Sequence, residues 1–204
     1  MFTIVPPILG WNFNVPQQSE HYLVITALGT DRPGIVNTIT RHVSSCGCNI
    51  EDSRLALLGE EFTFIMLLSG SWNAISLLES TLVQKGVELD LLIVMKRTTQ
   101  HLRPPMPMTM WVKVEVKDSP HIIERFTNLF DSAQTNIAEL ISKTSICKET
   151  NTPMLGIEMT LHSALTGNHD DLEQRFYRLC AELNAQGSIN IVINPQHEQK
   201  DGNS

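Results

Sequence analysis

The sequence predicts an α+β protein whose two halves repeat the order strand, helix, strand, strand, helix, strand. Hydrophobic residues follow strand and helix periods in this order twice, and a proline-rich stretch separates the two runs. The composition also suits a folded core, since 42% of the 204 residues are hydrophobic and 18% are charged. That length allows either one large domain or two small ones, and the repeat favours two.

The first half opens with a β-rich run over 22–28 that ends in a cluster of turn formers over 29–34. A helix follows, because Ile35, Ile39 and Val43 recur every four residues until Gly47. Strands over 50–58 and 62–68 flank a short polar turn and form a hairpin. A second helix is expected to stop before Gly86, and a last strand spans 89–95.

The second half restarts the same pattern after the prolines. Hydrophobic residues alternate over 110–116, and a turn containing Pro120 leads into a helix through Ile122 and Phe126. A hairpin over 136–147 and 154–162 comes next. A helix over 172–183, closed by Gly187, and a strand over 189–193 complete the half.

An internal match supports duplication of one module. With an offset of 87, Asp31 meets Asp118 and Pro33 meets Pro120. We therefore expect two tandem ferredoxin-like βαββαβ modules, each an antiparallel sheet with its helices on one face. The expected segments are an irregular extension over 1–19, a first module over 20–97, a proline-rich linker over 98–108, a second module over 109–194 and a polar tail over 195–204.

The charge and the apolar runs exclude several classes of protein. The formal charge is −7, and both modules are negative, at −2 over 21–97 and −4 over 109–194. Non-specific attachment to nucleic acid or anionic lipid is therefore not expected. No run of 18 apolar residues could span a bilayer, and the start of the chain does not resemble a secretory signal. We expect a cytoplasmic protein with reduced cysteines.

Motifs of catalysis and metal binding are missing from the sequence, which has no nucleophile elbow, Walker A loop, dinucleotide fingerprint, H-E-x-x-H or Cys-x-x-Cys pair. We expect no enzyme, no cofactor and no metal, because Cys46 and Cys48 near His42 lack a second pair. Phe62 and Phe64 are spaced as in RNA-recognition modules, but acidic residues precede them, so core packing explains them better.

The loop over 30–34 is the candidate binding element. It lies between a buried strand and a helix N-terminus, where backbone N–H groups and the helix dipole favour a carboxylate. Gly34 would let a ligand approach the backbone, and Asp31 could accept bonds from an ammonium group. An α-amino acid uses both features, although a well-capped helix is the simpler interpretation of the loop.

The turn Asp31-Arg32-Pro33-Gly34-Ile35-Val36, followed by 47–52, resembles the ACT domain, a small-molecule-sensing βαββαβ module. More narrowly, the segments 21–29, 37–43 and 70–75 and the linker over 103–107 are similar to a family of tandem ACT-domain repressors of the glycine cleavage genes in gamma-proteobacteria. The resemblance runs from about Glu20 to the C-terminal tail and is more specific in the first module.

The resemblance implies a regulator that has no DNA-binding domain of its own. Such a protein contacts a LysR-type activator of the glycine cleavage operon, and glycine weakens that contact. Direct binding to nucleic acid or membrane is not expected, whereas a homodimer is, because the sheet edges and free faces can pair with a second copy. The alternatives are a purely structural dimerisation module and an ACT protein that senses another small amino acid.

The resemblance also implies where the ligand binds. ACT sites lie where the first loop of one module meets the start of the second strand of a partner module. The implied ligand-binding residues are Asp31, Arg32, Pro33, Gly34, Ile35, Asn49, Ile50, Asn136 and Ile137. The second loop, Asp118, Ser119, Pro120 and His121, is a further candidate. Ser119 and His121 replace Arg32 and Gly34 there, and the added side chain narrows the space, so we expect binding through the first loop.

Overall fold

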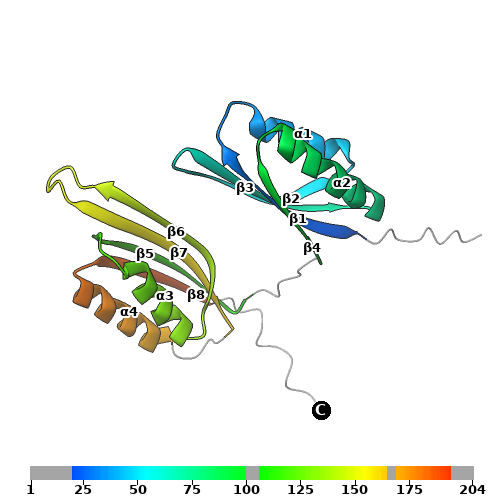
Figure 1. The fold of residues 1–204 in the computed structure, drawn as a ribbon. Coiled ribbons are helices and arrows are strands. Elements are labelled where there is room, and N and C mark those ends of the chain that lie inside the picture. Colours follow the sequence, from blue (N-terminus) through cyan, green and yellow to red (C-terminus); the bar gives the residue numbers. More distant parts are fainter. Residues whose placement is uncertain (1–19, 100–105, 165–168, 194–204) are drawn as a thin grey trace, which may run out of the picture. The chain divides into compact units, whose positions relative to one another are not determined.

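The computed structural model describes residues 20–99, 106–164 and 169–193, and the chain divides into two compact units, Met1–Leu102 and Arg103–Ser204. The first module contains β1 (His21–Thr30), α1 (Ile35–Ser45), β2 (Asn49–Leu58), β3 (Glu61–Gly70), α2 (Trp72–Glu88) and β4 (Leu92–Thr98). The second contains β5 (Met108–Lys117), α3 (Ile122–Ser132), β6 (Asn136–Ile146), β7 (Pro153–Ser163), α4 (His169–Leu183) and β8 (Gln186–Ile193). The predicted α+β class and the repeated βαββαβ order are confirmed (Figure 1).

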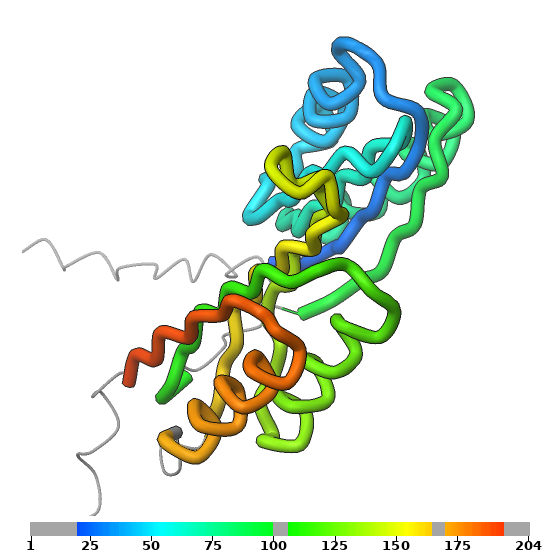
Figure 2. The backbone as a smooth tube through the Cα atoms, turned by 90° about the vertical axis from the view of Figure 1, so that its left-hand side faces the viewer, coloured from blue at the N-terminus to red at the C-terminus, as the bar shows by residue number. Residues whose placement is uncertain are grey.

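Each module is a fully antiparallel four-stranded sheet with two helices on one face. The strand orders are β2-β3-β1-β4 and β6-β7-β5-β8, so the two central strands of each sheet are the first and third of the module. Figure 2 shows α3 and α4 side by side against one face of the second sheet. The other face of each sheet carries no helix of its own module (Figure 1).

The core of each module forms between the sheet and the helices. In the first module, Ile35, Ile39 and Val43 of α1 are buried as their four-residue spacing predicted. Phe62 and Phe64 are 1% and 5% exposed, which confirms core packing over base stacking. In the second module, aromatic rings of the two helices pack together, and those of Phe126 and Phe176 are tilted at 51° with their centroids 6.0 Å apart.

Gly86 does not end the second helix, and that prediction was wrong. Helix α2 continues to Glu88, and Gly86 is buried inside it. A Cβ at this position would lie 2.6 Å from Cγ1 of Ile93 on β4, so glycine is required by the close approach of helix and strand. Residue 89 is the C-cap of α2 and Asp90 has a φ of 51°, so the last strand starts at Leu92 rather than at 89.

The prediction that Gly187 closes the second helix of its module was also wrong. Helix α4 ends at Leu183, and Gly187 lies within β8. A Cβ there would lie 2.5 Å from Sγ of Cys180 and 2.8 Å from the ring of Phe176. Both glycines therefore mark the place where a helix crosses its sheet most closely, and neither is a helix cap.

Strand pairing also moves the edges of the predicted linker. Strand β4 extends to Thr98, which pairs with Tyr22, and β5 begins at Met108, which pairs with Ser163. Both residues had been assigned to the linker because of the nearby prolines. The extension over 1–19, the tail over 195–204 and residues 100–105 of the linker lie outside the described residues.

Candidate functional site

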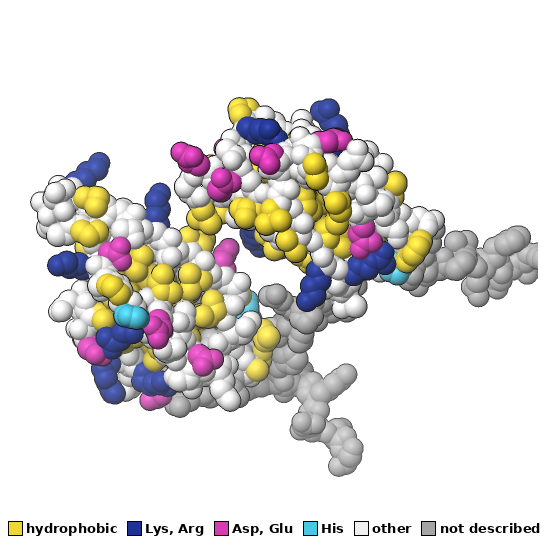
Figure 3. Space-filling model, viewed as in Figure 1, with side chains coloured by type: hydrophobic (Ala, Val, Ile, Leu, Met, Phe, Trp, Pro, Cys, Tyr) yellow, Lys and Arg dark blue, Asp and Glu magenta, His cyan; other side chains and the backbone are white. Residues whose placement is uncertain are grey.

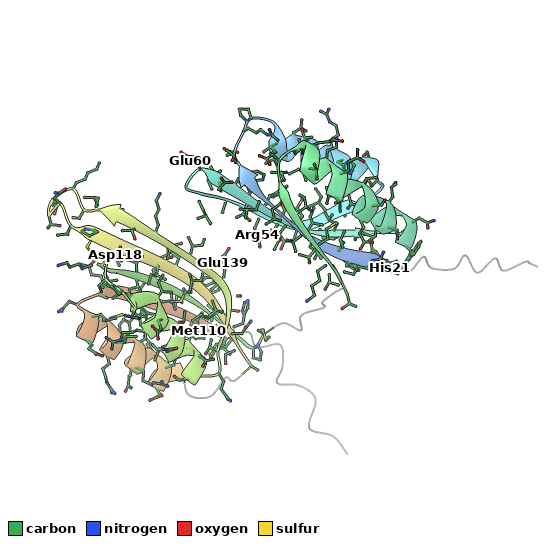
Figure 4. The ribbon with its side chains drawn as sticks, viewed as in Figure 1. His21, Arg54, Glu60, Met110, Asp118 and Glu139 are labelled. Carbon is green, nitrogen blue, oxygen red and sulfur yellow. The ribbon has the colours of Figure 1, made fainter. Side chains whose placement is uncertain are left out.

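The β1–α1 loop, residues 31–34, is anchored at both ends and open at its centre. The backbone N–H of Asp31 donates to the carbonyl of Glu60 (3.2 Å), which ties the loop to the tip of the β2–β3 hairpin (Figure 4). The guanidinium of Arg32 donates to the carbonyl of Leu89 in the turn after α2. All four loop residues are exposed, so the loop faces solvent between two fixed attachments.

Gly34 is the N-cap of α1 and adopts a left-handed conformation, with φ 84° and ψ −3°. Its carbonyl accepts the N–H of Thr38 (2.9 Å) and the hydroxyl of Thr38 (3.0 Å). No side chain caps the helix, so Asp31 does not have the capping role that was the simpler interpretation of the loop. A Cβ on Gly34 would meet nothing within 4 Å, so the space in front of the helix terminus is open.

Asn49 and Ile50 lie at the other end of the same sheet. Asn49 pairs with Ser69, which in turn pairs with Tyr22 at the start of β1, whereas the loop follows Thr30 at its end. Eight residues of strand separate these positions, about 27 Å. The structure therefore does not bring Asn49 and Ile50 to the first loop of their own module, and Asn136 is equally far from the second loop.

Local bonds hold the start of β2. The amide of Asn49 donates to the carboxylate of Glu51 (2.8 Å), and the hydroxyl of Ser69 donates to the same carboxylate. These two hydrogen bonds, Ser69 first, hold the pKa of Glu51 below its usual range. Ile50 packs against the core, whereas Asn49 and Glu51 are exposed and have the chemistry to contact a ligand.

The β5–α3 loop, residues 118–121, repeats the first loop with a different side chain at the helix start. His121 is the N-cap of α3, with φ 68° and ψ 2°, and its carbonyl accepts the N–H of Arg125 (3.0 Å). The imidazole Nδ1 lies 2.8 Å from the carboxylate of Glu124. The backbone N–H of Asp118 donates to the carbonyl of Pro153 (2.9 Å), as Asp31 does to Glu60.

A pocket of about 470 Å³ opens at this second loop. Its wall includes Ser142 and Thr144 of β6, and the Thr144 hydroxyl donates to the carboxylate of Asp118 (3.0 Å). The imidazole of His121 lines the pocket without filling it. His121 therefore does not close the space at the second loop, where a polar cavity remains.

Sequence reasoning missed Ser142 and Thr144. By strand register they correspond to Leu55 and Leu57 of β2, which are 47% and 59% exposed beside the first loop. The sequence does contain this difference: residues 142–144 are Ser-Lys-Thr, whereas the corresponding residues 55–57 are Leu-Ala-Leu. Its meaning depends on the register of the edge strand, which places these side chains next to the loops.

Of the three residues near a candidate metal site, Cys46 and Cys48 lie in the core and His42 is half-buried. Cys46 and Cys48 are buried, and burial raises the pKa of Cys48. The imidazole of His42 hydrogen-bonds the hydroxyl of Thr81 (2.9 Å), and burial lowers its pKa. Within residues 20–99, 106–164 and 169–193, no three His, Cys, Asp or Glu side chains are grouped to hold a metal ion. No helix in those ranges is long and apolar enough to cross a membrane.

The amino-acid sequence is similar to known regulators. The ACT domain model matches residues 21–96. The glycine cleavage system transcriptional repressors of Escherichia coli K12 and Shigella flexneri are each 68% identical over 184 residues, which is 90% of this chain and 97% of the relative.

Solved structures agree with both modules. A crystal structure provisionally named as a glycine cleavage system transcriptional repressor is 40% identical, has a TM-score of 0.64, and covers 86% of this chain and 99% of its own. An unknown protein from Galdieria sulphuraria, with a TM-score of 0.69, is 23% identical and covers 85% of this chain and 99% of its own. The second likeness shows the tandem fold alone.

Proposed function

Because the chain belongs to the glycine cleavage system transcriptional repressors, a family of tandem ACT-domain regulators, we propose that it represses the glycine cleavage genes under the control of glycine bound at the β1–α1 loop. The observation that carries the proposal is the 68% identity across 97% of the Escherichia coli repressor. The protein is a transcriptional regulator and not an enzyme.

Glycine suits the open end of α1. Its carboxylate would accept from the N–H groups of the first helical turn, where the dipole is positive, and its ammonium would bind the carboxylate of Asp31. The space in front of Gly34 has no Cβ to occupy it, so the ligand can approach the backbone. Selection against larger amino acids would then be steric.

The rest of the site would come from another ACT module. Asn49 lies about 27 Å from the loop of its own module, so it can contribute only to a loop on a different module. The same holds for Asn136 and the second loop. Under this proposal, binding joins two modules and changes the surface that they offer to other proteins, provided that glycine binds the two arrangements unequally.

The partner would be a LysR-type activator of the operon. Both modules have a negative net charge, which disfavours direct binding to operator DNA. In the described residues, no helix has a basic face with exposed polar side chains that could contact DNA bases. The repressor would bind the activator when glycine is scarce and release it when glycine is abundant. An electrophoretic shift assay tests this step: the protein alone should leave operator DNA unshifted, and it should supershift the activator complex only without glycine.

Calorimetric titration of glycine, alanine and serine into the full chain tests the site. The informative pair is Gly34→Asn and His121→Asn, because asparagine tolerates a positive φ and both variants should fold. We expect Gly34→Asn to weaken glycine binding at least about tenfold and His121→Asn to leave it unchanged. The reverse result would move the site to the pocket at the second loop, and no binding of any amino acid would favour a structural module.

A further inference from the structure

We propose that two copies of the chain associate through the free face of the first module's sheet, the face opposite α1 and α2, with the strands of the two sheets aligned. The proposal rests on the pattern of side chains on this face. It does not depend on where glycine binds or on the activator.

The strand register sorts the free-face residues into rows, because residues directly opposite in an antiparallel pair point to the same side. The rows, read from β2 to β4, are Leu58–Glu61–Thr30, then Ala56–Thr63–Leu28–Leu92, then Arg54–Ile65–Thr26–Val94, then Asp52–Leu67–Val24–Lys96, and finally Asn49–Ser69–Tyr22–Thr98. The second and third rows contain a single charged residue, Arg54, and it lies on the edge strand. The centre of the face is therefore apolar and its rim is charged.

The large hydrophobic side chains of this face are exposed. Leu58, Leu92 and Val94 are 70%, 62% and 55% exposed, and Ile65 and Leu28 are 41% and 40% exposed. Figure 3 shows hydrophobic side chains gathered over the strands of the first module. The largest apolar patch on a protein surface is often a contact surface, and this face is the candidate in the first module.

The free face of the second module carries more charged and polar side chains in the same fold, beside the exposed Trp111 and Ile141. One of its rows reads Lys143–Gly156–Glu115–Gln186, and the ammonium of Lys113 pairs with the carboxylate of Glu158 (3.0 Å). An open depression of about 500 Å³ lies above Gly156. The same sheet can therefore present a polar free face, so the apolar one is a property of the first module.

A second copy of the same face fits it in size and charge. A two-fold axis parallel to the strands lays β2 of each copy over β4 of the other, and β3 over β1. Leu92 then faces Ala56, Leu28 faces Thr63, and Ile65 faces Thr26, so each large side chain meets a smaller one. At the rim, Asp52 of each copy faces Lys96 of the other, and opposite charges meet twice.

An axis across the strands gives a poorer fit. It would place each strand over the same strand of the second copy, with the order of the rows reversed. Asp52 would then face Leu58, and Arg54 would face Ala56. In the favoured arrangement Arg54 keeps its ion pair with Asp52 at the rim, and its aliphatic stem covers Val94 of the second copy. Charge and size together select the axis parallel to the strands.

The area suits a weak dimer. Four strands 4.8 Å apart and the first four rows of side chains span a face of about 500 Å² per copy, so about 1,000 Å² is buried in total. That is at the small end of specific protein interfaces, and we expect dissociation constants in the micromolar range. When two twisted sheets pack face to face with aligned strands, their strand directions differ by about 30°, and the proposed interface allows this angle.

Sedimentation equilibrium of the full chain tests the face. We expect the wild-type protein to dimerise and Ile65→Glu to be monomeric, with an unchanged circular dichroism spectrum. The matched control is Ile141→Glu, at a 55% exposed position on the free face of the second module, and it should remain dimeric. A wild-type protein that stays monomeric up to about 200 µM, for instance because another segment or protein covers the face, would overturn the proposal.

A cross-link tests the register. Ala56→Cys and Leu92→Cys are placed together in a Cys147→Ser background, since the other three cysteines are buried. In one chain these positions lie on the two outer strands, about 14 Å apart, so a short thiol cross-linker joins them only between copies. We expect a covalent dimer from the double variant and none from Ala56→Cys alone. A dimer that resists Ile65→Glu, or one that fails to cross-link, refutes this arrangement.

Discussion

The β1–α1 loop of the first module and the β5–α3 loop of the second have nearly the same backbone conformation. The side chains of the edge strand beside each loop differ. Gly34 and His121 adopt almost the same left-handed conformation, and each accepts the N–H of the residue four positions later. Beside the first loop lie Leu55 and Leu57, whereas Ser142 and Thr144 stand beside the second. The turn is the same in both modules, and the side chains of the edge strand differ.

The difference teaches that a repeated backbone does not imply a repeated site. The second loop has a polar pocket that includes the carboxylate of Asp118, and the first has an open glycine at an uncapped helix terminus. The free faces of the two sheets diverge as well, one apolar and the other charged. One fold therefore offers two loops and two faces with different chemistry.

The largest effect is expected from a substitution that destabilises the second module and leaves the stability of the first unchanged. Gly187→Val should destabilise it by about 3 kcal/mol, because the new side chain overlaps Cys180 and Phe176. Scanning calorimetry should show that module's melting temperature fall by more than about 10 °C while the first module's transition stays in place. The control is Gly156→Val in the same sheet, where a Cβ meets only a carbonyl at 3.7 Å; comparable losses in both variants would contradict this account.

Exchange of the two helix starts should have opposite effects on stability. His121→Gly relieves a left-handed non-glycine residue and should stabilise the second module by about 1 kcal/mol, whereas Gly34→His should destabilise the first by a similar amount. Urea unfolding of each variant measures both changes. If His121→Gly proves destabilising, the exposed pair with Glu124 contributes more than the backbone strain.

Removal of the two loop aspartates should separate structure from binding. Asp118→Ala removes the acceptor of the Thr144 hydroxyl and should cost about 0.5–1 kcal/mol of stability, with glycine affinity unchanged. Asp31→Ala should weaken glycine binding and change stability by less than about 0.5 kcal/mol. Thermal melts and calorimetric titrations of both variants test the contrast, and it fails if Asp31→Ala leaves glycine affinity intact.

The smallest effect depends on pH and belongs to the first module. Arg97 bonds Glu79 through Nε (2.9 Å) and Nη2 (2.6 Å), and this hydrogen bonding lowers the pKa of Glu79. Because the folded pKa lies below the unfolded value of about 4.3, the stabilisation is present above that value and is lost as the pH falls through the folded pKa. Glu79→Gln should lower the melting temperature at pH 7, and the difference from wild type should shrink as the pH falls below the unfolded pKa of about 4.3.

Much of the fold could be predicted because the spacing of hydrophobic residues indicates which face of a helix or strand is buried. The four-residue spacing of Ile35, Ile39 and Val43 can bury only one face of a helix, and all three are buried. The glycines were harder, because one residue type serves as a cap, as a left-handed turn or as a point of close approach. Gly47 does follow the end of α1 with a φ of 79°, while Gly86 and Gly187 make room for packing partners distant in sequence.

The sequence by itself determined the strand and helix order, the duplication and the family, since these are properties of local pattern and residue identity. Only the tertiary structure decided which residues meet: that Asp31 leaves α1 uncapped, that Asn49 is remote from its own loop, and that Thr144 reaches Asp118. The physical reason is strand register. A shift of one residue turns every side chain of a strand to the other face, and long-range pairing sets that register.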